Sequence, residues 1–190
     1  MNKTEVFFEN HKKVITNHLS KAKSSILVAM AFFTDSHLFD LLVKKAQEGV
    51  KVQLIVRDDE INTMSGIDYG TLKNVKGDFC YNKDIHHKFC VIDGITVLSG
   101  SYNWTNQARM NHEDLILIDG DLLVAGMYMV KFFKIKDPAH FIRRALLQDG
   151  GSSNRRSERV ERRNNINVKR EEIRKAIAQR NAATTTTAKR

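Results

Sequence analysis

The sequence feature that most constrains the fold is the pair Asp93-Gly94, which lies between two short apolar runs, FCVI and ITVL. An Asp-Gly pair in this setting predicts a β-hairpin with a two-residue turn. The turn would pair Ile92 with Ile95, Cys90 with Val97, Lys88 with Ser99 and His86 with Ser101. Because side chains alternate along a strand, we expect His86, Lys88 and Ser101, followed by Asn103, to share one face.

Both faces of this hairpin carry apolar side chains, which predicts that the hairpin is buried. The expected faces are Cys90, Ile92 and Val97 beside His86, and Phe89, Val91 and Leu98 opposite. An ordinary exposed hairpin face is the alternative, but a lysine in a buried hairpin is costly unless it has a purpose. An imidazole, an ammonium, a hydroxyl and an amide on one surface are groups suited to binding a phosphate.

The residues before the hairpin predict a β-α-β unit. A strand over 24–33 is followed by a helix that Thr34, Asp35 or Ser36 can cap. The helix runs to about Glu48 and ends at Gly49, with its inward residues expected to be Leu38, Leu41, Leu42 and Ala46. A second strand, Lys51 to Arg57, should be parallel to the first.

The other segments complete an α/β prediction: a mixed β-sheet flanked by helices on both faces. We expect an amphipathic helix over Thr4–Lys21, and strands over Lys76–Tyr81 and Glu113–Asp119. A helix over 121–133 should turn five apolar residues inward, namely Leu122, Leu123, Met127, Val130 and Phe133. A polar connection over 58–75, with a short helix near Tyr69–Lys73, and a last helix over 140–147 are also expected.

Charge divides the chain into two parts. Residues 149–190 hold 12 Lys and Arg against 5 Asp and Glu, whereas residues 1–148 are almost neutral. We therefore predict a catalytic domain over 1–148 and a basic, linker-tethered tail over 149–190, partly helical or disordered. A basic extension is typical of polyanion binding, although a merely solvated tail is the alternative.

Composition also indicates the cellular compartment of the protein. Cys80 and Cys90 are too few for a disulfide framework, so two reduced thiols are expected. The first residues have no apolar signal region, and no apolar run is long enough to span a bilayer. We expect a cytoplasmic protein with no stable membrane anchor.

The spacing of the polar residues resembles the signature of the phospholipase D superfamily. The matching residues are His86-x-Lys88, then Asp93, then Gly100-Ser101-x-Asn103, and the likeness extends from about Thr4 to about Leu147. The chain is similar to small members with one motif each, which include bacterial endonucleases. The resemblance implies that His86 attacks a phosphodiester to form a phosphohistidine, while Lys88, Asn103 and Ser101 bind phosphate oxygens.

The resemblance assigns the remaining motif residues to supporting roles. Glu113 would accept a hydrogen bond from His86, and Asp93 and Gly100 would be structural. His87 would point to the far face. The leaving oxygen needs a proton that a nucleophilic histidine cannot give, so we expect a homodimer that supplies a second His86.

No metal or other cofactor is expected. The carboxylates near the motif are too scattered for a two-metal site. A zinc cluster of Cys80, His86, His87 and Cys90 is disfavoured because alternation places the two histidines on opposite faces.

Three functions remain open at this point. The first is a phosphodiesterase that cuts DNA or RNA, with the tail adding salt-sensitive affinity. The second is a phospholipase D-type lipid phosphodiesterase, which would need an apolar lip or anchor. The third is a non-catalytic nucleic-acid-binding module, which the intact set of His86, Lys88, Asn103 and Glu113 argues against.

Overall fold

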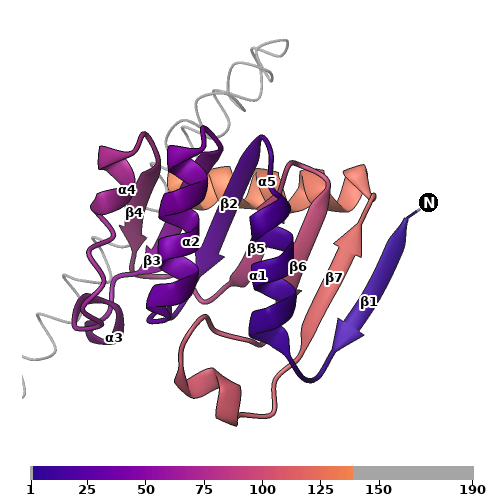
Figure 1. The fold of residues 1–190 in the computed structure, drawn as a ribbon, viewed down its shortest axis with the longest axis horizontal. Helices are drawn as coiled ribbons and strands as arrows, with labels where there is room; N and C mark the ends of the chain where they lie inside the picture. Colours follow the sequence, from indigo (N-terminus) through magenta and orange to yellow (C-terminus); the bar gives the residue numbers. More distant parts are fainter. Residues whose placement is uncertain (1, 139–190) are drawn as a thin grey trace, which may run out of the picture. The chain divides into compact units, whose positions relative to one another are not determined.

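The computed structural model describes residues 2–138 of the chain, which form a seven-stranded sheet with the order β1-β7-β6-β5-β2-β3-β4 (Figure 1). The neighbouring strands β2, β3 and β4 are parallel, and the other pairs are antiparallel. The strands are β1 (Lys3–Phe7), β2 (Ser25–Met30), β3 (Lys51–Arg57), β4 (Asp78–Asn82), β5 (Lys88–Ile92), β6 (Thr96–Gly100) and β7 (Leu115–Asp119). The expected mixed α/β sheet and its parallel β2–β3 pair are confirmed.

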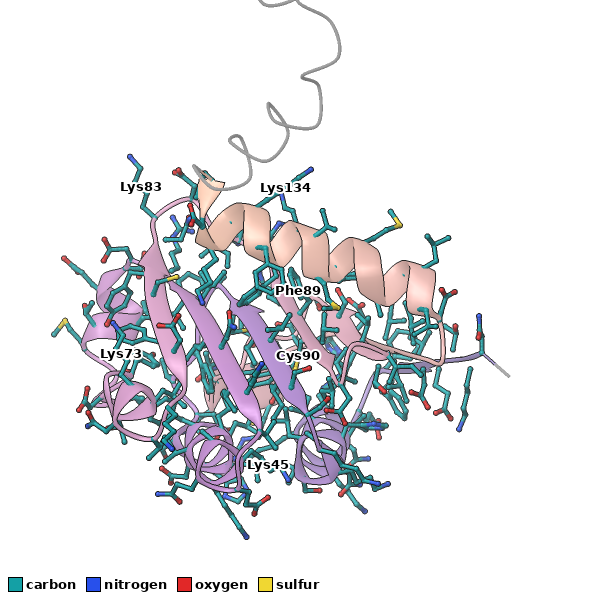
Figure 2. The ribbon with its side chains drawn as sticks, turned by 90° about the horizontal axis from the view of Figure 1, so that it is seen from above. Lys45, Lys73, Lys83, Phe89, Cys90 and Lys134 are labelled. Carbon is teal, nitrogen blue, oxygen red and sulfur yellow. The ribbon has the colours of Figure 1, made fainter. Side chains whose placement is uncertain are left out.

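Helices lie on both faces of the sheet, as expected. Figure 2 shows α1 (His11–Lys21) and α2 (Ser36–Gln47) on one face and α5 (Leu122–Lys136) alone on the other. We call these the α1/α2 face and the α5 face. Short helices α3 (Glu60–Thr63), α4 (Thr71–Asn74) and η1 (Gln107–Met110) occupy the connections. Among the described residues, no helix is long and apolar enough to cross a membrane.

Helix α2 shows how local sequence sets its bounds. Of the three possible caps, Asp35 serves: its carboxylate accepts a hydrogen bond from the Leu38 N–H at 3.2 Å. Gly49, at φ +93°, turns the chain after the helix ends. Leu38, Leu42 and Ala46 are buried as predicted, because the spacing of four residues places them on one side of the helix.

The N-terminal prediction was wrong in part. A helix was expected from Thr4, but Lys3–Phe7 form the edge strand β1, which pairs antiparallel with β7. The chain then turns at Asn10, whose φ of 58° is left-handed, and α1 begins at His11. The partner strand lies more than a hundred residues further along the chain, so local periodicity could not reveal this pairing.

The inward face of α5 was also predicted wrongly. Its buried residues are Ala125 and Phe132, whereas Leu122, Leu123, Met127, Val130 and Phe133 are between 40% and 76% exposed. Apolar residues occur all round this helix, so its pattern does not single out one face. The exposed set, which we call the α5 stripe, therefore has no covering partner among residues 2–138.

The hairpin forms, but with a different register. Asp93 (φ 53°) and Gly94 (φ 69°) make the expected turn, and the Ile95 N–H donates to the Ile92 carbonyl at 3.1 Å. Ile92 nevertheless pairs with Thr96 in the ladder, so Ile95 is an extra residue, as in a β-bulge. The slip of one residue exchanges the predicted faces of Val97 and Leu98 and opposes Ser99 to Phe89.

Several predictions fall on residues 139–190, outside the described part of the chain. They are the helix over 140–147, the domain boundary at 148, the Gly-Ser linker, and the partly helical or disordered tail over 149–190.

Candidate active site

The motif residues gather at one end of the sheet, where β2 and β6 end and β5 and β7 begin. In Figure 1 this is the lower end, to which the arrowheads of β1 and β2 point. The residues after β2 connect the two halves of the motif. The Ala31 N–H donates to the His87 carbonyl at 2.8 Å, and the Phe32 N–H donates to Asn103 Oδ1 at 3.2 Å.

Lys88 is half-buried at the start of β5, beside Met30 in the ladder. Its Nζ donates a hydrogen bond to the His86 carbonyl oxygen at 3.0 Å. Burial lowers the pKa of Lys88, Glu113 acts in the opposite direction, and Arg57 lowers it further. The ammonium therefore lies close to both Glu113 and the His86 backbone.

Ser101 and Glu113 are joined directly. The Ser101 hydroxyl donates to Glu113 Oε2 and accepts from the Asp114 N–H at 2.9 Å. Asn111 Nδ2 donates to the other carboxylate oxygen, Oε1, at 3.3 Å. Because the hydroxyl has one proton and that proton is directed at Glu113, Ser101 is arranged here to hold Glu113 rather than to donate to a phosphate.

The expected hydrogen bond from His86 to Glu113 is not formed among the described residues. The Glu113 carboxylate is instead held by Ser101 and Asn111. In the observed register Phe89 opposes Ser99, so Ser101 is not directly opposite His86. The His86 side chain is exposed at this end of the sheet, and its approach to a ligand is open.

Gly100 and Asp93 support the site through the backbone. A Cβ on Gly100 would lie 2.2 Å from the Asp114 carbonyl oxygen, so only glycine allows β6 and β7 to approach this closely. At the other end of the hairpin, the Asp93 carboxylate accepts from the N–H groups of Lys23, Ser24 and Ser25 at 2.7–3.2 Å. Asp93 thus has a structural role, as expected, through amides that are distant in the sequence.

Those hydrogen bonds decide the ionisation of Asp93. Partial burial by itself would raise the pKa of the carboxyl, but the three backbone donors and the Ser24 hydroxyl outweigh it, and the pKa is lowered. The charged form is therefore the one that fixes the turn to the start of β2.

His87 faces away from the site, as expected. Its ring lies 5.6 Å from that of Phe89, which in turn contacts Tyr128 of α5 at 5.0 Å. Burial, Lys131, Lys88 and His86 all lower the pKa of His87. His87 therefore links the end of the sheet to the α5 face.

Arg57 is a site residue that the sequence reasoning did not find. It ends β3, lies over the Phe32 ring at 5.9 Å, and pairs with Asp59 at 3.7 Å. Its charge is close enough to lower the pKa of Lys88. The available signal was positional: the carboxyl ends of parallel strands share one edge of a sheet, and ligands often bind there.

No group of three or more His, Cys, Asp or Glu side chains among residues 2–138 is arranged to hold a metal ion. Cys90 is buried and Cys80 half-buried, both with free thiols, and burial raises the pKa of each thiol. Burial therefore disfavours the thiolate, which is the nucleophilic form, of both residues.

Comparison with known proteins agrees with this geometry. Residues 15–135 match the family described as "Cardiolipin synthase, PLD-like domain". Mitochondrial cardiolipin hydrolase from Xenopus tropicalis is 30% identical over 129 residues, which are 65% of this chain and 61% of that protein. The mouse protein of the same name is 28% identical over 120 residues, covering 62% and 54%. The chain thus spans only about half to three fifths of the length of these relatives.

Solved structures share the fold. Nuc from Salmonella typhimurium, a phospholipase D family member, superimposes with a TM-score of 0.64 at 18% identity, over 72% of this chain and 95% of that one. NucT from Helicobacter pylori gives 0.62 at 21% identity, over 72% and 97%. The family match covers most of the described residues and contains the whole His86-to-Asn103 motif. The chain therefore belongs to the phospholipase D-like family.

Proposed function

We propose that this protein is a metal-independent phosphodiesterase, an endonuclease that cleaves DNA or RNA through a phosphohistidine on His86, at a homodimer interface. The observation that carries the proposal is that His86 is exposed while the half-buried Lys88 ammonium donates to the His86 backbone carbonyl at 3.0 Å, at the end of the sheet where Asn103 and Glu113 also lie. Phosphodiester transfer needs this pairing of a nucleophile with a fixed positive charge.

The first chemical step forms a bond between a neutral ring nitrogen of His86 and the phosphorus. The bond from phosphorus to the leaving oxygen breaks, and a second imidazole gives that oxygen its proton. In the second step water attacks the phosphohistidine, the same second imidazole takes the water's proton, and His86 is released. A proton donor of this kind contributes roughly 10²–10⁴-fold to the rate.

Lys88 and Asn103 are the groups best arranged to stabilise the phosphoryl oxygens. Asn103 Oδ1 accepts from the Phe32 N–H, which fixes the amide and leaves its Nδ2 as a donor. Lys88 supplies the charge. Ser101 acts through Glu113, and Glu113 keeps the Lys88 ammonium charged by opposing the effect of burial on its pKa.

The second imidazole is supplied by a second copy, and the α5 stripe is the surface on which that copy docks. Gly126 lies within this stripe, and a Cβ added there would meet nothing within 4 Å. A glycine inside a helix costs about 1 kcal/mol relative to alanine. Close approach of a partner helix across Gly126 explains why a glycine is present.

Charge favours an antiparallel, two-fold pairing of the two α5 helices. Asp119 and Asp121 lie at the N-terminal end and Lys131 lies in the C-terminal half, where Lys136 is already paired with Asp78 at 2.6 Å. A two-fold axis near the middle of the helix brings acidic ends against basic ends. The chain of contacts from Tyr128 through Phe89 to His87 connects this axis to the strand that begins beside His86.

A lipid phosphodiester is the second candidate substrate. The relatives are named mitochondrial cardiolipin hydrolases, and the α5 stripe offers an apolar surface. We favour nucleic acid because the tail over 149–190 is strongly basic and Lys13 and Arg109 lie beside the site. The non-catalytic nucleic-acid-binding module remains the third candidate, because TrmBL2, an archaeal chromatin protein that binds DNA, shares the fold with a TM-score of 0.55 at 18% identity.

The test is cleavage of a matched panel: single- and double-stranded DNA, RNA and cardiolipin vesicles, with the full chain in excess chelator. Wild type should cut a nucleic acid, and His86→Ala should lose at least about 10³-fold in rate, as expected for loss of the nucleophile. His18→Ala, on the last turns of α1, is the control and should retain activity. Cleavage of cardiolipin alone would select the lipid enzyme, and binding without cleavage would select the non-catalytic module.

A further inference from the structure

A pocket of about 620 Å³ opens beside the candidate active site, and the chemistry described so far does not use it. Its lining residues come mainly from the turn before α1, the start of α1, and the η1 segment with the residues after it. These segments lie at the end of the sheet to which β1 points (Figure 1). Phe8 and Lys13 line one side, and Arg109 and His112 line the other. We call it the α1–η1 pocket.

The start of α1 gives this pocket a positive character. Asn10 makes no side-chain cap, and the first turn carries no acidic residue, so the first N–H groups of the helix remain unsatisfied by side chains. Lys12 forms an ion pair with Asp35, with 2.7 Å between Nζ and Oδ2, which neutralises its charge. Lys13 and Arg109 remain, against the single carboxylate of Glu9.

Tyr102 supplies a second, independent sign of a ligand. It lines the pocket, is only 2% exposed, and stacks on His11 at 4.7 Å between ring centroids. Its hydroxyl has no hydrogen-bond partner among the described residues. Leaving such a group unsatisfied costs about 1–3 kcal/mol. Burial and nearby Asp35 raise the pKa of Tyr102, so the hydroxyl is a donor near neutral pH.

The α1–η1 pocket adjoins the candidate active site through Asn111. Tyr102 lies in sequence between Ser101 and Asn103. Asn111, which also lines the pocket, donates to Glu113 Oε1 at 3.3 Å. A substrate with more than one phosphate can therefore occupy both places at once.

We propose that the α1–η1 pocket binds the phosphate next to the one that His86 attacks, in a single-stranded nucleic acid. The α1 N-terminus, Lys13, Arg109 and the Tyr102 hydroxyl hold that phosphate. Phe8, which is 72% exposed at the rim, stacks on the adjoining base. This inference rests on the proposed nuclease function and adds the form of substrate that the enzyme takes.

Binding in the inactive His86→Ala background tests the pocket independently of cleavage. The probe is a fluorescent 12-nucleotide single strand, followed by anisotropy at several salt concentrations. Lys13→Ala combined with Arg109→Gln should raise Kd about tenfold and reduce the salt slope by roughly 0.7, because the contact with one phosphate is lost. The control is Lys51→Ala, an exposed lysine at the opposite end of the sheet, which should leave Kd unchanged.

A second measurement separates binding from a structural effect. With His86 intact, the same double variant should cleave bis(p-nitrophenyl) phosphate, a diester with one phosphate, at the wild-type rate. It should show a raised KM on the oligonucleotide, and Tyr102→Phe should raise that KM about threefold.

Several results would overturn the inference. One is an unchanged Kd in the double variant, and another is a rise in Kd of the same size in Lys51→Ala. A third is a loss of cleavage rate on the small diester as large as the loss on the oligonucleotide. Weakened binding to cardiolipin vesicles, with oligonucleotide binding unaffected, would assign the pocket to a lipid and contradict the nucleic-acid proposal. If wild type binds the oligonucleotide through the pocket but never cuts it, the nuclease proposal fails while the pocket stands.

Discussion

The two faces of the sheet bury their apolar residues to different extents. On the α1/α2 face, 25 buried residues form one core in which α1, α2 and α4 leave little apolar surface open. On the α5 face, nine buried residues of the described part of the chain lie under α5, and that helix exposes the five apolar residues of the α5 stripe. Within residues 2–138, the first face is covered and the second is not. An uncovered apolar face of this kind is what the proposed homodimer would bury.

The largest expected effect tests the α1/α2 face. Leu42→Ala removes a fully buried side chain from α2 and should lower the free energy of unfolding by about 3 kcal/mol, from lost burial and the cavity left behind. Chemical denaturation measures this loss. The oligomeric state of the folded fraction should not change; a variant that dissociates without losing stability would contradict the division between the faces.

The next effect tests the α5 stripe. Leu123 is 76% exposed, so Leu123→Asp should leave protomer stability nearly unchanged but weaken self-association at least about tenfold, because it buries a charge in the interface. Sedimentation velocity measures the association, and the cleavage rate per chain should fall with it. Met64→Asp, at an 82% exposed position after α3, is the matched control for association. A fully active, monomeric Leu123→Asp variant would rule out the shared site.

A smaller effect concerns the hairpin turn that both faces share. Asp93→Asn keeps a residue that tolerates the left-handed φ but removes the charge that accepts three N–H groups, and should cost about 1 kcal/mol. Because the folded-state pKa of Asp93 is lowered, its stabilising effect is present above the ordinary pKa of an aspartate and is lost as pH falls through the folded value.

The measurement for Asp93 is denaturation of both proteins between pH 3 and pH 7. The difference in stability between wild type and Asp93→Asn should be constant near neutrality and should shrink as the medium becomes acidic. A difference that grows towards low pH would show that the charge is not what holds the turn.

The smallest effect distinguishes the two roles of α5. Gly126→Ala should stabilise the isolated protomer by about 0.5–1 kcal/mol, since alanine favours a helix and its Cβ meets nothing within the chain. The same methyl group should weaken dimerisation, because it separates the two helices. Thermal melts at low and high protein concentration separate these contributions. Equal stabilisation at both concentrations would argue against helix contact at Gly126.

Local signals predicted what depends on local chemistry. Gly49 and the β-branched run over 51–57 placed β3 at its observed bounds, and the Asp93-Gly94 pair placed the turn. The extra residue Ile95 could not be foreseen, because the bulge depends on how the ladder closes around it. It shifted the register by one and with it the expected partner of His86.

Non-local packing accounts for the other differences. The inward side of α5 depends on which apolar residues the sheet accepts, and a helix that is apolar all round offers no pattern to choose by. Arg57 reaches the site only because β3 lies beside β2 and both end at the same edge. The motif spacing, in contrast, is a local signal, and the structure places His86, Lys88 and Asn103 at one end of the sheet.

Gly100 carries a consequence for how this motif can vary. The Asp114 carbonyl occupies the space that a Cβ on residue 100 would need. The absence of a side chain at Gly100 therefore sets the distance between β6 and β7, and with it the position of the Glu113 carboxylate. Replacing Gly100 by a larger residue would push the start of β7 away from β6 and would displace Glu113 with it. A substitution at a glycine that does not contact the substrate can therefore abolish activity even though all of the reactive groups are still present.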